Sequence, residues 1–105
     1  MLYYIGNTES FNKLIQSPVM ICMFTASWCK PCLQLKPKVI AYGESHKDVP
    51  VAIVDVDTMS SLAQFYFINS VPTFLVFKNG TLTKRFQIPN PDTLETLFDN
   101  SFNSS

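Results

Sequence analysis

The stretch FTASWCKPC, residues 24–32, determines how the rest of the sequence is interpreted. It begins at the end of a continuous apolar run over residues 19–24, which is typical of a strand covered on both faces, as in a parallel sheet. After Cys32, apolar residues recur at the spacing of a helix that contains Pro37. The motif therefore lies at a strand-to-helix junction, where Cys29 meets the unpaired N–H groups and the positive end of the helix dipole.

A Cys-x-x-Cys pair at such a junction is typical of exchange chemistry between thiols and disulfides. The helix N-terminus stabilises the thiolate of the first cysteine and makes it reactive. Two intervening residues bring the second sulfur close enough to attack a mixed disulfide formed on the first. Pro31 fixes the backbone at an early helical position where its missing N–H is not needed, and Trp28 gives the pair a flat, partly apolar flank. We therefore expect Cys29 to attack and Cys32 to resolve.

The alternatives for the cysteine pair are a zinc site and two ordinary core thiols. Zinc needs more ligands, and the remaining candidates, Cys22 and His46, lack ligand spacing. Cys22 lies in the buried strand pattern and is interpreted as a core thiol, whereas His46 lies in a polar stretch and is expected to be solvated. Core burial of the pair itself fits poorly with the polar Ser27 and Lys30 beside it. The sequence therefore predicts no metal site.

The remaining pattern predicts one α/β domain over residues 1–105, in which a central mixed sheet is flanked by helices. Asn79 and Gly80 between two apolar runs predict a two-residue hairpin turn. Asn90 and Pro91 predict the start of the last helix, and the polar residues 100–105 are expected to fray. The expected order is β-α-β-α-β-α-β-β-α, with strands over 2–5, 19–25, 51–57, 73–77 and 82–88 and helices over 8–16, 32–43, 59–67 and 91–99.

Composition and charge exclude several classes of protein. Apolar residues make up 47% of the chain and charged residues 15%, which suffices for a core without metal or disulfide staples, and the aromatic residues 65–67 are interpreted as packing. Eight acidic residues balance eight basic ones, so neither nucleic acid nor an anionic membrane is expected as a partner. The longest apolar run is far below the ~20 residues that span a bilayer. The N-terminus shows no secretory pattern, so we expect a cytoplasmic protein.

Four motifs resemble those of the thioredoxin family in the same order, and the similarity covers nearly the whole chain. They are the segment 24–32, the helix proline Pro37, the loop at residues 71–73 and the hairpin FKNG at 77–80. The resemblance implies the thioredoxin fold, with Cys29 attacking and Cys32 resolving. It also implies a cis Pro72 beside which an extended substrate segment docks, although the residues alone allow an ordinary proline at a strand start. The substrate-binding residues implied are Trp28, Lys30, Pro31, Val71, Pro72, Thr73 and Ile88.

This chain departs from the family pattern at several positions. Where the family buries an aspartate that faces a lysine on the next strand, the chain has Met23 and Ile53, and losing both charges together avoids a lone buried charge. We therefore expect Cys32 to lose its proton to solvent instead of through a buried carboxylate. Lys30 replaces the family's usual glycine, and either favours the attacking thiolate or points into water. Ile88 replaces another glycine and is expected to narrow the substrate groove or line it with apolar surface.

The resemblance implies an enzyme, a thiol–disulfide oxidoreductase that reduces protein disulfides through the cysteine pair and serves electron transport and redox homeostasis in the cell. Its implied partners are disulfide-containing proteins and a thioredoxin reductase or another dithiol donor. No bound cofactor is implied, and a monomer is expected. One alternative is a disulfide oxidase or isomerase, which Pro31 and the missing secretory pattern disfavour. The other is a non-enzymatic module that binds through Trp28, Pro72 and Ile88, although binding alone does not need two cysteines at this spacing.

Overall fold

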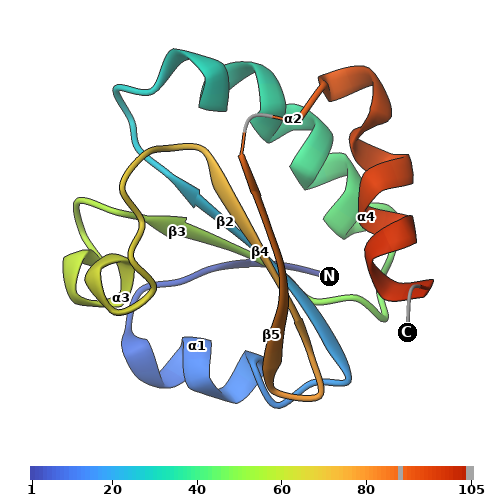
Figure 1. Cartoon of the computed structure of the whole chain (residues 1–105), viewed down its shortest axis with the longest axis horizontal. Coiled ribbons are helices and arrows are strands. Elements are labelled where there is room, and N and C mark those ends of the chain that lie inside the picture. Colours follow the sequence, from blue (N-terminus) through green and yellow to red (C-terminus); the bar gives the residue numbers. More distant parts are fainter. Residues whose placement is uncertain (88, 104–105) are drawn as a thin grey trace.

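The computed structural model describes residues 1–87 and 89–103. Helices and strands alternate as predicted, so the expected order is confirmed (Figure 1). The elements are β1 (Leu2–Tyr4), α1 (Thr8–Leu14), β2 (Val19–Thr25), α2 (Lys30–Ser45), β3 (Val51–Asp55), α3 (Ser60–Phe65), β4 (Thr73–Lys78), β5 (Thr81–Gln87), the short 3₁₀ helix η1 (Pro91–Thr93) and α4 (Leu94–Asn103).

The strands form a five-stranded mixed sheet in the order β1-β3-β2-β4-β5. β1 and β2 pair in parallel with β3, and β4 pairs antiparallel with β2 and with β5. β2 therefore lies at the centre, and its residues 20–25 are all buried. This position explains the uninterrupted apolar run, because a central strand is covered on both faces. The predicted mixed sheet flanked by helices is confirmed.

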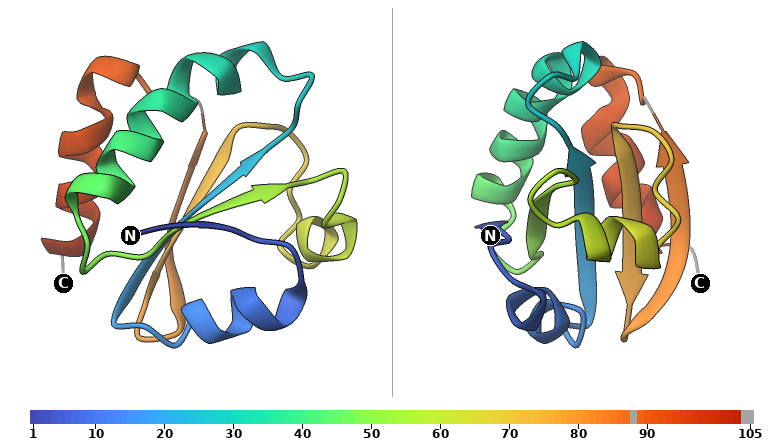
Figure 2. Two further views of the ribbon diagram at one scale, coloured as in Figure 1. Left: turned by 180° about the vertical axis from the view of Figure 1, so that it is seen from behind. Right: turned by 90° about the vertical axis from the view of Figure 1, so that its left-hand side faces the viewer.

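The helices cover both faces of the sheet: α2 and α4 lie on one face, and α1 and α3 lie on the other (Figures 1 and 2). Successive side chains of β2 point to opposite faces. Met23 packs in the core beneath α2 and α4, which we call the α2–α4 core. Cys22 packs in the core beneath α1 and α3, the α1–α3 core, so its interpretation as a core thiol is confirmed. Across the described residues, no helix combines the length and the apolar character needed to cross a membrane.

The hairpin between β4 and β5 turns at the predicted position. Asn79 has φ 53° and Gly80 has φ 83°, and both values are positive. A type I′ turn requires positive φ at both central residues, which is why the pair Asn-Gly is favoured there. Lys78 and Thr81 face each other across the turn, so β5 begins one residue earlier than predicted. The hairpin prediction is confirmed.

Two helices extend beyond their predicted ends. α2 continues past Gly43 to Ser45. α4 includes residues 100–103, so the expected fraying of these residues is wrong, while residues 104–105 lie outside the described residues. The reason is burial: Ser101 is buried and donates a hydrogen bond from Oγ to the Leu97 carbonyl oxygen at 2.8 Å, and Phe102 packs against the α2–α4 core. The polar composition of residues 100–103 therefore led to a wrong prediction, because these residues form a packed turn of α4.

The aromatic residues 65–67 pack only in part. The Tyr66 ring lies 5.8 Å from the Phe11 ring and 5.6 Å from the Phe77 ring, within the α1–α3 core. Phe65 is 72% exposed and contacts the Tyr66 ring edge-on at 4.9 Å, whereas Phe67 is 77% exposed, so the interpretation as packing is wrong for Phe67. α3 ends at Phe65, and Tyr66 directly after it is the residue whose ring packs against the core.

His46 is half-buried and not simply solvated as expected. It caps the C-terminus of α2, and its ring stacks on the Tyr42 ring with centroids 3.8 Å apart. Its Nε2 lies 3.6 Å from Oδ1 of Asp99, which also accepts a hydrogen bond from the Tyr42 hydroxyl at 2.7 Å. The extension of α2 by two residues brings His46 back onto the preceding helical turn.

Candidate active site

The cysteine pair lies where β2 passes into α2. The connecting segment is closed by a hydrogen bond from the Cys29 N–H to the Ala26 carbonyl oxygen at 3.2 Å. Cys29 is the N-cap of α2, and Cys32 lies in the first turn of the helix. The two cysteines form a disulfide with their Cα atoms 5.3 Å apart. The structure thus places the pair at the predicted strand-to-helix junction.

A backbone N–H in the first turn of α2 points at the sulfur of Cys29. The Cys32 N–H donates a hydrogen bond to Cys29 Sγ at 3.2 Å, as an N-cap side chain usually receives one. Together with the helix dipole, this N–H favours negative charge on that sulfur in the reduced state. Cys29 is 3% exposed and Cys32 1%, so the sulfurs lie just beneath the surface.

A cis-proline loop faces the disulfide. The peptide bond between Val71 and Pro72 is cis, as the resemblance implied. The carbonyl oxygen of Val71 lies 3.5 Å from Cys29 Sγ. Thr73, the first residue of β4, is fully buried and donates a hydrogen bond from its hydroxyl to the Ser70 carbonyl oxygen at 2.7 Å. The loop and the first cysteine are therefore in contact.

Gln87 fastens this loop from β5 and was not predicted. Its Nε2 donates hydrogen bonds to Ser70 Oγ at 3.0 Å and to Thr73 Oγ1 at 3.3 Å. Gln87 stands opposite Thr73 in the β4–β5 register. A count outward from the predicted turn would have set Thr73 opposite Phe86, because an irregularity between Val76 and Phe77 shifts the register by one residue, so no sequence pattern pointed to Gln87.

Trp28 directly precedes Cys29 in the chain and is 67% exposed. Its Nε1 donates a hydrogen bond to Oδ2 of Asp57, which follows β3, at 2.9 Å. Val56 and Val71 join Trp28 in lining a small surface pocket of about 110 Å³ beside the cis-proline loop. Exposed apolar surface next to a reactive sulfur is suited to receiving a substrate chain. Asp57 was missed because a tryptophan partner 29 residues away leaves no pattern in the sequence.

Of the remaining predicted site residues, Lys30 and Pro31 begin α2 and are exposed beside the cysteines. Ile88 lies outside the described residues. The structure thus brings Trp28, the two α2 residues and the loop at residues 71–73 together around the disulfide.

Comparison with known proteins agrees with this geometry. The family model described as Thioredoxin matches residues 3–100. The thioredoxin of Coprinus comatus is 36% identical over 104 residues, which cover 96% of this chain and 98% of that protein. The chain belongs to the thioredoxin family. The solved structure of Malassezia sympodialis thioredoxin has a TM-score of 0.86 at 27% identity, with 96% of this chain and 93% of that one covered. The oxidised thioredoxin of Plasmodium falciparum has a TM-score of 0.85 at 27% identity, with coverage of 95% and 97%.

Family membership defines the chemistry of the cysteine pair. Thioredoxins are disulfide oxidoreductases, and this chain carries their active-site pair at Cys29 and Cys32. The protein is therefore an enzyme that reduces disulfides through this dithiol. Among the described residues, no three histidine, cysteine, aspartate or glutamate side chains are placed to hold a metal ion.

The replacement of the family's buried ion pair is structurally consistent. Met23 on β2 stands opposite Ile53 on β3, and the two are 0% and 4% exposed. Met23 packs in the same α2–α4 core as both active-site cysteines. Apolar groups in both positions leave no uncompensated charge in this core, which can match or exceed the stability of a buried ion pair.

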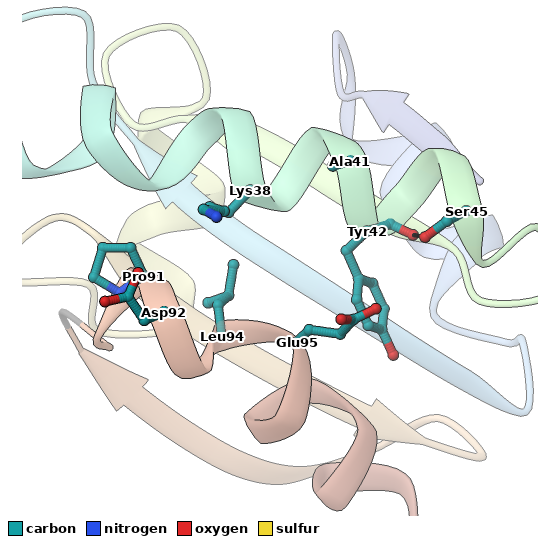
Figure 3. A pocket seen from close by; sticks show the side chains of 8 residues that line it. All are labelled: Lys38, Ala41, Tyr42, Ser45, Pro91, Asp92, Leu94 and Glu95. Atoms are coloured by element: carbon teal, nitrogen blue, oxygen red, sulfur yellow. Dashed lines mark hydrogen bonds between the residues drawn. The ribbon is translucent and has the colours of Figure 1, made fainter.

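A separate pocket of about 240 Å³ lies between α2 and the chain around η1 and α4 (Figure 3). Lys38 and Tyr42 line it from α2, and Asp92 and Glu95 line it from the other side. None of its lining residues belongs to the cysteine site. Burial and the hydrogen bond with Asp99 raise the pKa of Tyr42, so its hydroxyl stays protonated at neutral pH.

Proposed function

We propose that Cys29 is the attacking thiol and Cys32 the resolving thiol when this thioredoxin reduces a protein disulfide. The contact that carries this assignment is the approach of Cys29 Sγ to the Val71 carbonyl oxygen, because it places Cys29 on the side of the cis-proline loop. The Cys32 N–H donated to the same sulfur supports the thiolate of Cys29. Cys32 lies one helical turn further along α2.

The reaction transfers two electrons from the dithiol to the substrate. The Cys29 thiolate attacks one sulfur of the substrate disulfide, that bond breaks, and the second substrate sulfur leaves as a thiolate and takes up a proton. Cys32 loses its proton and attacks Cys29 Sγ in the mixed disulfide. The first substrate sulfur then leaves in turn, and the Cys29–Cys32 disulfide remains.

The substrate segment is proposed to dock on the surface that joins exposed Trp28 to the cis-proline loop. The small pocket lined by Trp28, Val56 and Val71 supports this placement. Lys30 and Pro31 border the surface on the α2 side. Because Thr73 is fully buried, its proposed role is to shape the loop and not to touch substrate.

We further propose that the chain is a single-domain, monomeric, cytoplasmic thioredoxin in electron transport and redox homeostasis, re-reduced by a thioredoxin reductase or another dithiol donor. The match to 98% of the length of the Coprinus comatus thioredoxin supports the single domain. Reduction of the oxidised chain by a purified thioredoxin reductase tests the donor. Elution as a dimer in size-exclusion chromatography would contradict the monomer.

Trapping the mixed disulfide tests the roles of the two cysteines. Mass spectrometry should find the Cys32→Ser variant covalently joined to a disulfide-containing substrate protein through Cys29. The Cys29→Ser variant should form no such adduct and reduce no substrate. An adduct on Cys32 in the Cys29→Ser variant, formed at the rate seen on Cys29, would reverse the assignment.

A further inference from the structure

A small pocket opens beside Cys32, separate from the surface around Trp28. Its volume is about 90 Å³, and Cys32 and Lys36 line it from α2. Thr25 and Asp55 line it from the ends of β2 and β3, where the parallel register sets them opposite each other. A water molecule takes about 30 Å³ in the liquid, so this polar pocket has room for water.

The proposed reaction requires Cys32 to lose a proton within the mixed disulfide. Cys32 is 1% exposed and packs in the α2–α4 core, and such burial disfavours the charged thiolate. Met23 and Ile53 nearby are apolar and accept no proton. Among the described residues that line the pocket, Asp55 is the one carboxylate.

We propose that Asp55 accepts the proton of Cys32 through water in this pocket. This inference rests on the proposed roles of the two cysteines. The Cys32 proton passes to a water molecule, which passes a proton to the Asp55 carboxylate. The Cys32 thiolate then attacks Cys29 Sγ, and the departing substrate sulfur takes the electron pair of the broken bond. Asp55 afterwards returns its proton to solvent, so the carboxylate is restored.

The Asp55 carboxylate is held in place by its own backbone turn. Its Oδ1 accepts hydrogen bonds from the Asp57 N–H at 2.8 Å and the Thr58 N–H at 3.3 Å. Lys36 lies one helical turn from Cys32 and lines the same pocket, and its Nζ lies 5.8 Å from the centre of the Tyr4 ring. The next carboxylate along the chain, Asp57, is engaged by Trp28. The titratable groups at this pocket are therefore Cys32 and Lys36 from α2 and Asp55 from β3.

The Asp55→Asn variant removes the proton acceptor but should keep the local fold, because an asparagine Oδ1 can accept the same two backbone hydrogen bonds. Mixed-disulfide formation is timed in the Cys32→Ser background, with and without Asp55→Asn, and should proceed at the same rate. Resolution is timed in the wild-type chain and in Asp55→Asn by acid quench after a single turnover. We expect resolution to slow ~10-fold or more, since a positioned proton acceptor contributes at least that much.

The pH profile and two further variants sharpen the test. Resolution by Asp55→Asn should depend on pH differently from resolution by the wild-type chain. Asp55→Glu should recover part of the rate. The matched control is Asp92→Asn, which removes a carboxylate from the separate pocket of about 240 Å³ shown in Figure 3. This variant should resolve the mixed disulfide at the wild-type rate.

Resolution by Asp55→Asn at the wild-type rate across the pH range would overturn the inference and assign the proton directly to solvent. Equal slowing of both steps would also overturn it, because a structural defect would then explain the loss. Failure of the wild-type chain itself to form an adduct through Cys29 would overturn the proposed function, and this inference with it.

Discussion

At the scale of single residues, the hydroxyl of Thr73 links the cis-proline loop to the hairpin. It donates to the Ser70 carbonyl oxygen and accepts from Gln87. Thr73→Val keeps the shape of the side chain but removes both hydrogen bonds, whose other partners belong to the exposed residues Ser70 and Gln87. We expect the free energy of unfolding to fall by about 0.5–1.5 kcal/mol.

Urea unfolding of the oxidised protein measures this effect. Thr81→Val is the matched control, because Thr81 also lies in a strand of the hairpin but is exposed. It should change stability by less than about 0.5 kcal/mol. Equal effects of the two substitutions would show that the Thr73 hydrogen bonds contribute nothing beyond strand propensity.

The sequence predicted the reacting residues better than the residues that support them. Cys29 and Cys32 stand three positions apart, so a local pattern reveals their chemistry. Asp57 and Gln87 act through partners 29 and 14 residues away. Such contacts depend on strand register and loop path, which spacing along the chain does not specify.

At the scale of elements, α1 has seven residues and depends on its N-cap. Asn7 has extended backbone geometry and accepts a hydrogen bond on its side chain from the Ser10 N–H at 2.8 Å. Helices this short gain little from propagation. We expect Asn7→Ala to lower the free energy of unfolding by about 1 kcal/mol.

Thermal or urea unfolding tests the cap against a second asparagine in the same helix. Asn12 is exposed within α1, where alanine has the higher helix propensity, so Asn12→Ala should be neutral or slightly stabilising. A loss of stability in Asn12→Ala as large as that in Asn7→Ala would refute the capping role.

The paired positions on β2 and β3 permit a double-mutant cycle. Met23→Asp places a lone charge in the α2–α4 core and should destabilise the protein by about 3–5 kcal/mol. Adding Ile53→Lys supplies an opposite charge from the neighbouring strand and should recover about 1 kcal/mol or more. Met23→Leu, as the control, should cost less than about 1.5 kcal/mol.

The cycle compares four chains: wild type, Met23→Asp, Ile53→Lys and the double variant. Their free energies of unfolding give the coupling between the two sites. Strictly additive effects would contradict the view that Met23 and Ile53 replace an interacting pair. The cycle also bears on the Asp55 inference, because a new carboxylate at position 23 offers Cys32 a second proton acceptor and should weaken the effect of Asp55→Asn.

Element order was predictable because helices and strands have different hydrophobic periods. The ends of elements were less predictable. Residues 100–103 are helical in α4, where Ser101 is buried. α2 continues to Ser45, and the His46 ring then stacks on the Tyr42 ring. The order of the strands within the sheet, β1-β3-β2-β4-β5, was not predicted, since periodicity along the chain does not reveal which strands pair. Tertiary packing determines where elements end and which strands pair, and local sequence patterns predict tertiary packing poorly.

At the scale of the whole molecule, the sheet separates a reactive thiol region from an inert one. The active-site cysteines share the α2–α4 core, whereas Cys22 lies across the sheet in the α1–α3 core. Burial raises the pKa of the Cys22 thiol well above its ordinary value of 9.0. Cys22 is therefore protonated and inaccessible in the native protein, and thiol reagents should modify it only after unfolding.

The two cores also determine how stability depends on pH. Burial raises the pKa of Tyr66 in the α1–α3 core and of Tyr42 in the α2–α4 core, and Asp99 adds to the rise at Tyr42. For each raised group, the folded state retains a proton that the unfolded state loses. The associated stability is fully present at neutral pH and is lost as the pH rises above about 9 for Cys22 and about 10 for the tyrosines.

We therefore expect the free energy of unfolding of the oxidised protein to fall between pH 9 and 10, by at most ~1.4 kcal/mol per pH unit for each group that titrates. Cys29 and Cys32 do not contribute while they are joined in the disulfide. Cys22→Ala removes the one thiol that remains, so it should be less stable at pH 7 because of the lost packing, yet decline less steeply over this interval. Urea unfolding at pH 7, 9 and 10 measures both slopes. Parallel slopes would show that the Cys22 thiol is not the group whose proton the α1–α3 core retains.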